Sequence, residues 1–77
     1  MHLGYMLKGK TVEIISLDFK DEEVIHKLNN IGLVPQAQLK ILDYNKSKKV
    51  LHLLIYNVQY VLREQDCQHI NVQIVEK

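Results

Sequence analysis

The chain has 77 residues, of which 47% are apolar and 6% aromatic, and its 10 basic and 9 acidic side chains give a net charge of +1. This length predicts a single domain over residues 1–77 with a small aliphatic core. The near balance of charge argues against a nucleic-acid-binding protein, which usually carries a basic excess. The single cysteine, Cys67, excludes an intramolecular disulfide and a cysteine-rich zinc site.

The sequence contains no signal for membrane insertion or secretion. No hydrophobic stretch approaches the length of a membrane span. Residues 1–10 lack the charged start, long apolar run and cleavage site of a signal peptide. We therefore expect a cytoplasmic protein with no membrane insertion.

The first predicted elements are a strand and a helix. Residues 11–17 are β-branched and mostly apolar, which predicts a strand, and Gly9 marks the turn before it. Asp18 or Asp21 can cap the following helix. Apolar residues spaced by four and three positions then form one stripe of this helix: Val24, Leu28 and Ile31.

The helix ends in the most informative junction of the chain. Gly32 can adopt the left-handed conformation that ends a helix, and Pro35 cannot continue one. Between them lie Leu33 and Val34, an apolar pair on a loop. We expect Leu33 inside the core and Val34 at least partly exposed, so that this loop is the most plausible partner surface.

The remainder of the chain alternates like a series of short strands. Strands are predicted over residues 38–44, 50–56, 58–62 and 70–74, with turns at residues 45–48, at Asn57 and at residues 63–66. One face should be buried and carries Leu39, Ile41, Leu51, Leu53 and Ile55. Five strands and one helix in so short a chain predict a mainly β fold, a small SH3-like or OB-like barrel.

Several short segments of the sequence match the sequence pattern of a known family, in the same order along the chain. Leu3, Met6 and Gly9 match its lead-in, and residues 28–35 match a helix end of the form Leu, two residues, Met or Leu, Gly, Leu, one residue, Pro. Residues 61–63 match an Ala-Leu-Arg segment, and residues 70–72 match a final Ile-x-Val strand. This arrangement resembles the FeoA family of bacterial ferrous-iron transport, whose domain also occurs at the C-terminal end of some metal-dependent transcriptional repressors.

The resemblance implies a five-stranded SH3-like barrel with one short helix after the first strand. It also implies a non-enzymatic accessory role through contact with the cytosolic portion of the membrane permease FeoB, with recruitment to the inner face of the membrane. Three positions depart from the family pattern. Gln36 and Asn57 stand where glycine is usual, and Cys67 stands where a small alanine-like residue is usual.

The expected partner-binding residues come from the helix exit and from the matched arginine: Gly32, Leu33, Val34, Pro35 and Arg63. Arg63 could instead anchor a turn. Four tyrosines are further contact candidates, since tyrosine favours interfaces: Tyr5, Tyr44, Tyr56 and Tyr60. The sequence leaves open a homo-oligomer.

No residue pattern indicates catalysis, since there is no nucleotide-binding loop or catalytic triad. Cys67 and His69 would share one side of an extended segment, and His52 could join them, which makes these three the weak candidates for binding Fe²⁺ or another divalent transition metal. We therefore expect no cofactor beyond such weak binding. Two alternatives to the accessory role remain: a repressor-type interaction domain and a small transition-metal-binding protein.

Overall fold

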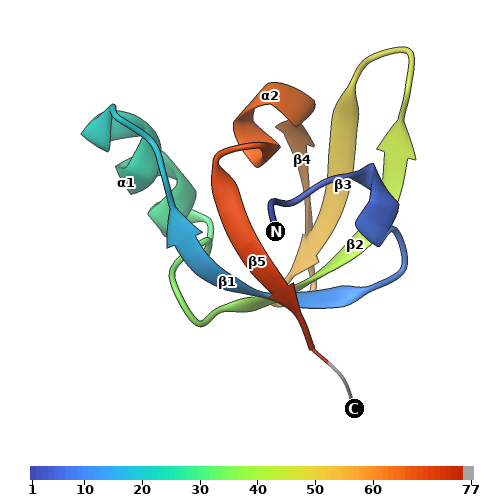
Figure 1. Cartoon of the computed structure of the whole chain (residues 1–77), viewed down its shortest axis with the longest axis horizontal. Coiled ribbons are helices and arrows are strands. Elements are labelled where there is room, and N and C mark those ends of the chain that lie inside the picture. The colour runs from blue at the N-terminus through green and yellow to red at the C-terminus, as the bar shows by residue number, and fades with distance from the viewer. Residues whose placement is uncertain (76–77) are drawn as a thin grey trace.

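Five antiparallel strands form one sheet in the order β4-β3-β2-β1-β5 in the computed structural model, which describes residues 1–75 (Figure 1). The strands are β1 (Thr11–Leu17), β2 (Gln38–Asn45), β3 (Val50–Ile55), β4 (Val58–Arg63) and β5 (Ile70–Ile74). The helices are η1 (Tyr5–Leu7, a 3₁₀ turn), α1 (Glu22–Asn30) and α2 (Glu64–Cys67). The predicted mainly β fold, with its helix after the first strand, is therefore confirmed, and the strand ends agree with the sequence pattern to within about one residue.

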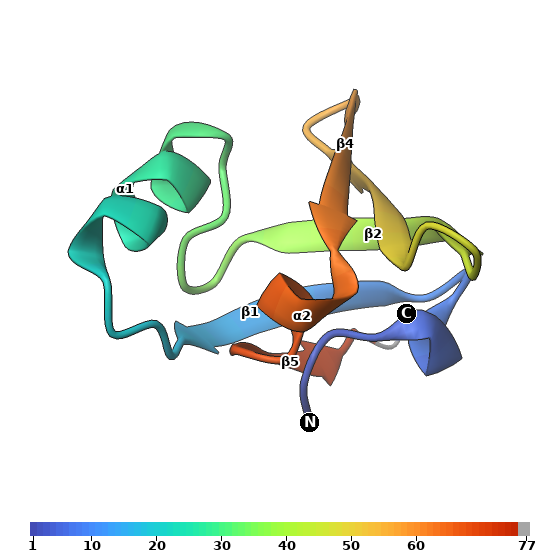
Figure 2. The same ribbon diagram turned by 90° about the horizontal axis from the view of Figure 1, so that it is seen from above.

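The sheet curls around its inner face without closing. β4 and β5 stand at its two edges, and the short helix α2 connects them (Figures 1 and 2). The register shifts at two places, between Ile14 and Ser16 in β1 and between Ile41 and Asp43 in β2. Such bulges bend and twist a strand, which lets a small sheet wrap its own core. The expected SH3-like shape is present as an open, barrel-like sheet.

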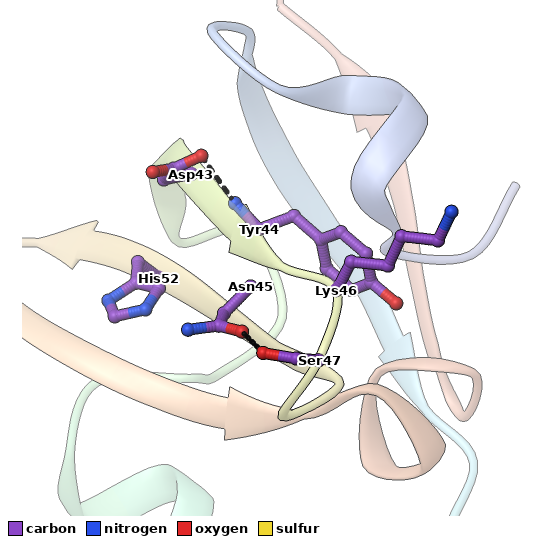
Figure 3. A pocket seen from close by; sticks show the side chains of 6 residues that line it. All are labelled: Asp43, Tyr44, Asn45, Lys46, Ser47 and His52. Atoms are coloured by element: carbon purple, nitrogen blue, oxygen red, sulfur yellow. Dashed lines mark hydrogen bonds between the residues drawn. The ribbon is translucent and has the colours of Figure 1, made fainter.

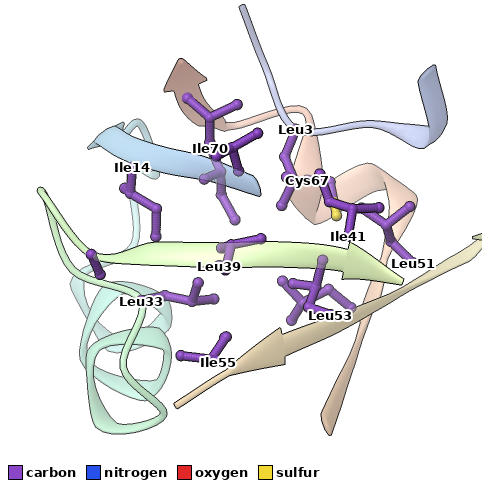
Figure 4. Packing of buried hydrophobic residues seen from close by; sticks show 14 of the residues in the cluster. Leu3, Ile14, Leu33, Leu39, Ile41, Leu51, Leu53, Ile55, Cys67 and Ile70 are labelled. Atoms are coloured by element: carbon purple, nitrogen blue, oxygen red, sulfur yellow. The ribbon is translucent and has the colours of Figure 1, made fainter. Parts of the chain in front are cut away.

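Alternate strand positions supply the core (Figure 4). The five residues predicted to share the inner face of β2 and β3 are each at most 2% exposed. Leu3, Leu33 and Cys67 join them from outside the sheet and are equally buried. Burying each leucine contributes about 1.5–3 kcal/mol, and the three buried side chains connect the N-terminal segment, the helix exit and α2 to the sheet.

The N-terminal segment covers one edge of the sheet. The Leu3 amide donates to the Ile70 carbonyl at 2.9 Å, and the Val72 amide donates to the Met1 carbonyl at 2.8 Å. His2 thereby forms a bridge to Asn71. The outer edge of β5 is therefore paired, whereas β4 pairs on one side only within residues 1–75.

Candidate protein-docking surface

Helix α1 is positioned by its two ends. At its start, the Asp21 carboxylate accepts a hydrogen bond from the Glu23 amide at 2.9 Å, so Asp21 is the cap rather than Asp18. Glu22 and Glu23 follow in the first turn, where the helix dipole favours carboxylates. The apolar stripe packs on the core, with Leu28 buried and Val24 and Ile31 half-buried.

At its end, α1 stops in a glycine-dependent hydrogen-bonded turn. The Leu33 amide donates to the Leu28 carbonyl at 2.9 Å, and the Gly32 amide donates to the Asn29 carbonyl at 3.0 Å. These two bonds form a Schellman motif, which requires a left-handed residue just past the helix. Gly32 fills that position with φ of +101°, as the sequence predicted.

Gly32 also lies directly against the turn between β3 and β4. A Cβ atom at Gly32 would come within 3.0 Å of both Ile55 Cγ2 and Tyr56 Cε2. The turn consists of Tyr56 and Asn57, which both have positive φ, at +49° and +66°. Two positive values define the type I′ turn that suits a two-residue hairpin, so Asn57 fulfils the predicted role of the usual glycine. The end of α1 at Gly32 therefore packs directly against the β3–β4 turn.

The loop after Gly32 is fastened to β1. The Gln36 amide donates to the Ile14 carbonyl at 2.7 Å, and the Ile14 amide donates to the Ala37 carbonyl at 2.9 Å. Gln36 has φ of +76°, a value that favours glycine. The position after Pro35 therefore demands positive φ, and Gln36 meets that demand with a side chain that carries a conformational cost.

The exposed part of this junction is a small apolar surface. Pro35 is exposed, Tyr56 is 73% exposed and Val58 is 49% exposed, while Val34 is half-buried beside the core. Leu33 is fully buried, as expected, and can act only by holding the loop in place. We call Pro35, Tyr56, Asn57 and Val58 the docking surface. The sequence did not identify Val58 as a surface residue, because the alternation of β4 places it on the inner face of the sheet. It is exposed only because it lies beside the turn, where nothing covers it.

Arg63 lies away from this surface. Val58 pairs with Ile55 beside the turn, whereas Arg63 pairs with Val50 at the other end of β4. Val58 and Arg63 are five positions apart along the strand, or roughly 17 Å at the usual rise per residue. The structure therefore does not bring Arg63 together with the Gly32–Pro35 loop, and the five expected partner-binding residues fall into two separate places.

The three weak metal-binding candidates do not form a site. Cys67 is 1% exposed, and burial, together with Asp66 and Glu64, raises the pKa of its thiol to about 12. His69 is exposed, and its ring contacts that of Phe19 in a tilted arrangement with the ring centres 5.3 Å apart, while His52 lies on the outer face of β3 between buried neighbours. In the part of the chain that the structure describes, no three His, Cys, Asp or Glu side chains gather as they would around a metal ion. Cys67 ends α2 and Gln68 has right-handed helical dihedral angles, so Cys67 and His69 do not lie in the extended segment that would place them on one side.

A shallow depression lies at the far end of β2 (Figure 3). Its rim includes Asp43, whose pKa is lowered by the hydrogen bond from the Tyr44 amide and by the Lys8 ammonium at 3.1 Å. Burial and the nearby Glu64 carboxylate raise the pKa of Tyr44. Asn45 closes the hairpin loop by accepting hydrogen bonds from Ser47 Oγ and the Lys48 amide, both at 3.0 Å. These groups order the hairpin and form no catalytic arrangement.

None of the helices within residues 1–75 is both long enough and apolar enough to cross a membrane.

Comparison with known proteins places the chain in a family. The FeoA domain model matches residues 1–74. Iron(II) transport protein A from Clostridium thermocellum is 25% identical, with a TM-score of 0.87 over 97% of this chain and 46% of that chain. The FeoA protein from Chlorobium tepidum is 23% identical, with a TM-score of 0.84 over 99% of this chain and 71% of that chain. A FeoA-like protein from Clostridium acetobutylicum, 17% identical, has a TM-score of 0.76 over 91% of this chain and 80% of its own length.

The chain thus spans about half the length of the first of these structures. No curated protein matches the sequence. The family model nevertheless covers almost every residue, and the fold agrees with it from the lead-in before Gly9 to the last strand. The chain therefore belongs to the FeoA family.

Proposed function

We propose that this chain is a non-enzymatic, cytoplasmic accessory protein of bacterial ferrous-iron uptake that binds the cytosolic portion of the permease FeoB. Family membership supports the link to iron transport, as does the description of the Clostridium thermocellum relative as an iron(II) transport protein. Ferrous iron is then the cargo of the permease and is not held by this chain.

The observation that carries the proposal is the exposed, largely apolar docking surface, which is held in place by the packing of the β3–β4 turn on Gly32. Tyr56 is the most exposed large apolar side chain of the described residues, and tyrosine is enriched among residues that dominate binding energy. Its ring rests against Gly32, and the hairpin turn and helix exit hold each other. A surface ordered before binding loses little conformational entropy on binding.

The mechanism is regulation by binding. A permease conformation that fits the docking surface better becomes more populated when this chain is present, by a factor equal to the ratio of its affinities for the two conformations. The chain supplies no reacting group in this mechanism. Its only cysteine is a buried, neutral thiol, which is a poor nucleophile.

A titration of the isotope-labelled chain with the soluble GTPase region of FeoB, followed by amide NMR, tests the proposal. We expect chemical-shift changes at Gly32–Pro35 and Tyr56–Val58. Tyr56→Ser should weaken binding at least tenfold, which corresponds to about 1.4 kcal/mol or more for a central aromatic contact. Tyr5→Ser is the matched control, because Tyr5 is also exposed, at 57%, but lies on η1.

Shift changes confined to another surface would contradict the proposed contact, as would equal losses in the two tyrosine variants. The absence of any shift change with the GTPase region, repeated with the full-length permease in detergent, would contradict the accessory function itself.

A further inference from the structure

The charged side chains of this nearly neutral chain are unevenly distributed over the molecule. Four cations lie at the end of the molecule formed by the β2–β3 hairpin and the end of β4: Lys46, Lys48, Lys49 and Arg63. Four carboxylates and one cation, Lys20, lie at the β1–α1 connection and the first turn of α1; the carboxylates are Asp18, Asp21, Glu22 and Glu23. Both views place α1 and this hairpin on opposite sides of the molecule (Figures 1 and 2). We call the two groups the basic end and the acidic end.

The basic end is assembled by the backbone. Val50 pairs with Arg63, and the Glu64 amide donates to the Lys49 carbonyl at 2.9 Å, so the hairpin loop and the start of α2 are held together. Lys48, Lys49 and Arg63 line one common depression, which also contains Glu64, so the cations outnumber the carboxylate there by three to one. The side chains of all four cations are exposed. The one ion pair within residues 1–75 joins Lys8 to Asp43 and leaves these cations free.

Exposed apolar side chains stand beside this charge. Met6 is 70% exposed and Tyr5 is 57% exposed. Both lie on η1, which is fixed to β2 near the hairpin by the Tyr5–Tyr44 ring contact at 5.3 Å and by the Lys8–Asp43 ion pair. In both views η1 lies on the side of the molecule where the hairpin begins (Figures 1 and 2).

We propose that the basic end and η1 together contact the surface of an anionic lipid bilayer. Lysine and arginine are attracted to acidic headgroups, and tyrosine and other apolar side chains settle at the headgroup level. The acidic end, on the opposite side, is repelled by the same surface and fixes the orientation. The charge separation therefore allows a chain of net charge +1 to bind such a surface in one orientation.

An acidic protein face would also attract four cations. The interfacial zone of a bilayer accommodates both the cations and the exposed Met6 and Tyr5 beside them, and binding of the same end to a protein is the competing outcome of the vesicle experiment below. The contact is peripheral, so it requires no membrane-spanning segment. It does not depend on the proposed function either, because it uses residues separate from the docking surface and a partner made of lipid alone.

Vesicle co-sedimentation of the full chain tests this inference, with phosphatidylcholine vesicles compared with vesicles that also contain phosphatidylglycerol. We expect binding only to the anionic vesicles. Raising the salt from 0.1 M to 1 M, which shortens the Debye length from about 10 Å to about 3 Å, should release the chain. Each basic side chain near such a surface raises the affinity by a factor of about five, which corresponds to about 1 kcal/mol. The double variant Lys46→Gln/Lys48→Gln should therefore weaken binding about 30-fold.

The matched control is Lys20→Gln/Lys27→Gln, which removes the same charge from the exposed side chains near the acidic end and should retain binding. Met6→Ser should weaken binding several-fold without altering the salt dependence. Equal losses in the two double variants would overturn the proposal, as would equal binding to both kinds of vesicle. So would an absence of vesicle binding, in which case a loss of FeoB binding by Lys46→Gln/Lys48→Gln would identify the basic end as a protein contact.

Discussion

Replacing Gly32 with alanine should destabilise the protein more than any other single alanine substitution at a glycine. Two costs add at this position. An L-residue at φ of +101° costs about 2 kcal/mol. The new Cβ would lie 3.0 Å from Ile55 Cγ2, which belongs to a side chain only 1% exposed, and moving such a packed group costs about 1–2 kcal/mol.

The net loss of stability is smaller than the sum of these two costs. Alanine also lowers the conformational entropy of the unfolded chain, and this raises the free energy of unfolding by about 0.5 kcal/mol. We therefore expect Gly32→Ala to lower the free energy of unfolding by about 3 kcal/mol. For a domain of this size, that corresponds to a fall in Tm of about 12–24 °C. Urea unfolding followed by far-UV circular dichroism measures the free energy, and a thermal scan measures Tm.

Gly9→Ala is the matched control. Gly9 has φ of +82° but nothing lies within 4 Å of its added Cβ. Only the backbone cost applies, so the loss should be about 1.5 kcal/mol. Equal losses at the two glycines would refute the claim that the helix exit and the β3–β4 turn are in close contact. A loss below about 0.5 kcal/mol at Gly32 would refute the strained backbone as well.

Three further predictions concern single side chains. Cys67→Ala tests the buried thiol. The pKa of the Cys67 thiol is about 12 in the folded chain, above the ordinary value near 9. The contribution of the neutral thiol to the free energy of unfolding is therefore fully present below pH 9 and is lost as the pH rises toward 12. Wild type should therefore lose about 1.4 kcal/mol per pH unit relative to Cys67→Ala between pH 9 and 11, measured by urea unfolding; parallel pH profiles would contradict the burial argument. Asp21→Ala removes the α1 cap and should cost about 1 kcal/mol in the same assay, and Asp18→Ala serves as the control that leaves the cap intact. Gln36→Gly should raise stability by about 0.5–1 kcal/mol because it relieves the φ of +76°, and a destabilised variant would show that the glutamine side chain contributes more than its backbone costs.

The sheet was predictable because its signal is local. Alternation in residues 38–44 and 50–56 identifies the inner face, and a one-residue error would turn every side chain outward. Gly32 and Pro35 likewise define the helix end by their own backbone restrictions. These signals need no knowledge of distant residues, which explains why the fold and the family resemblance could be read from the chain.

The site was less predictable because it depends on contacts between distant segments. Nothing in the sequence near Gly32 shows that Tyr56 lies against it. The separation of Arg63 from the helix exit follows from the β3–β4 pairing, and the burial of Cys67 follows from α2 packing over the sheet. Residues 1–3 carry no strand signal, yet they pair with β5.

That last pairing limits how copies of this chain can join. An uncovered strand edge is a template for another strand, and a sheet with two such edges can add copies at both sides without end. Here Met1–Leu3 occupies the edge of β5, so β4 is the edge that remains available within residues 1–75. Edge-to-edge association through β4 would therefore stop at two copies. Deleting the first three residues would uncover the edge of β5 as well, so that further copies could add at both edges and form fibres.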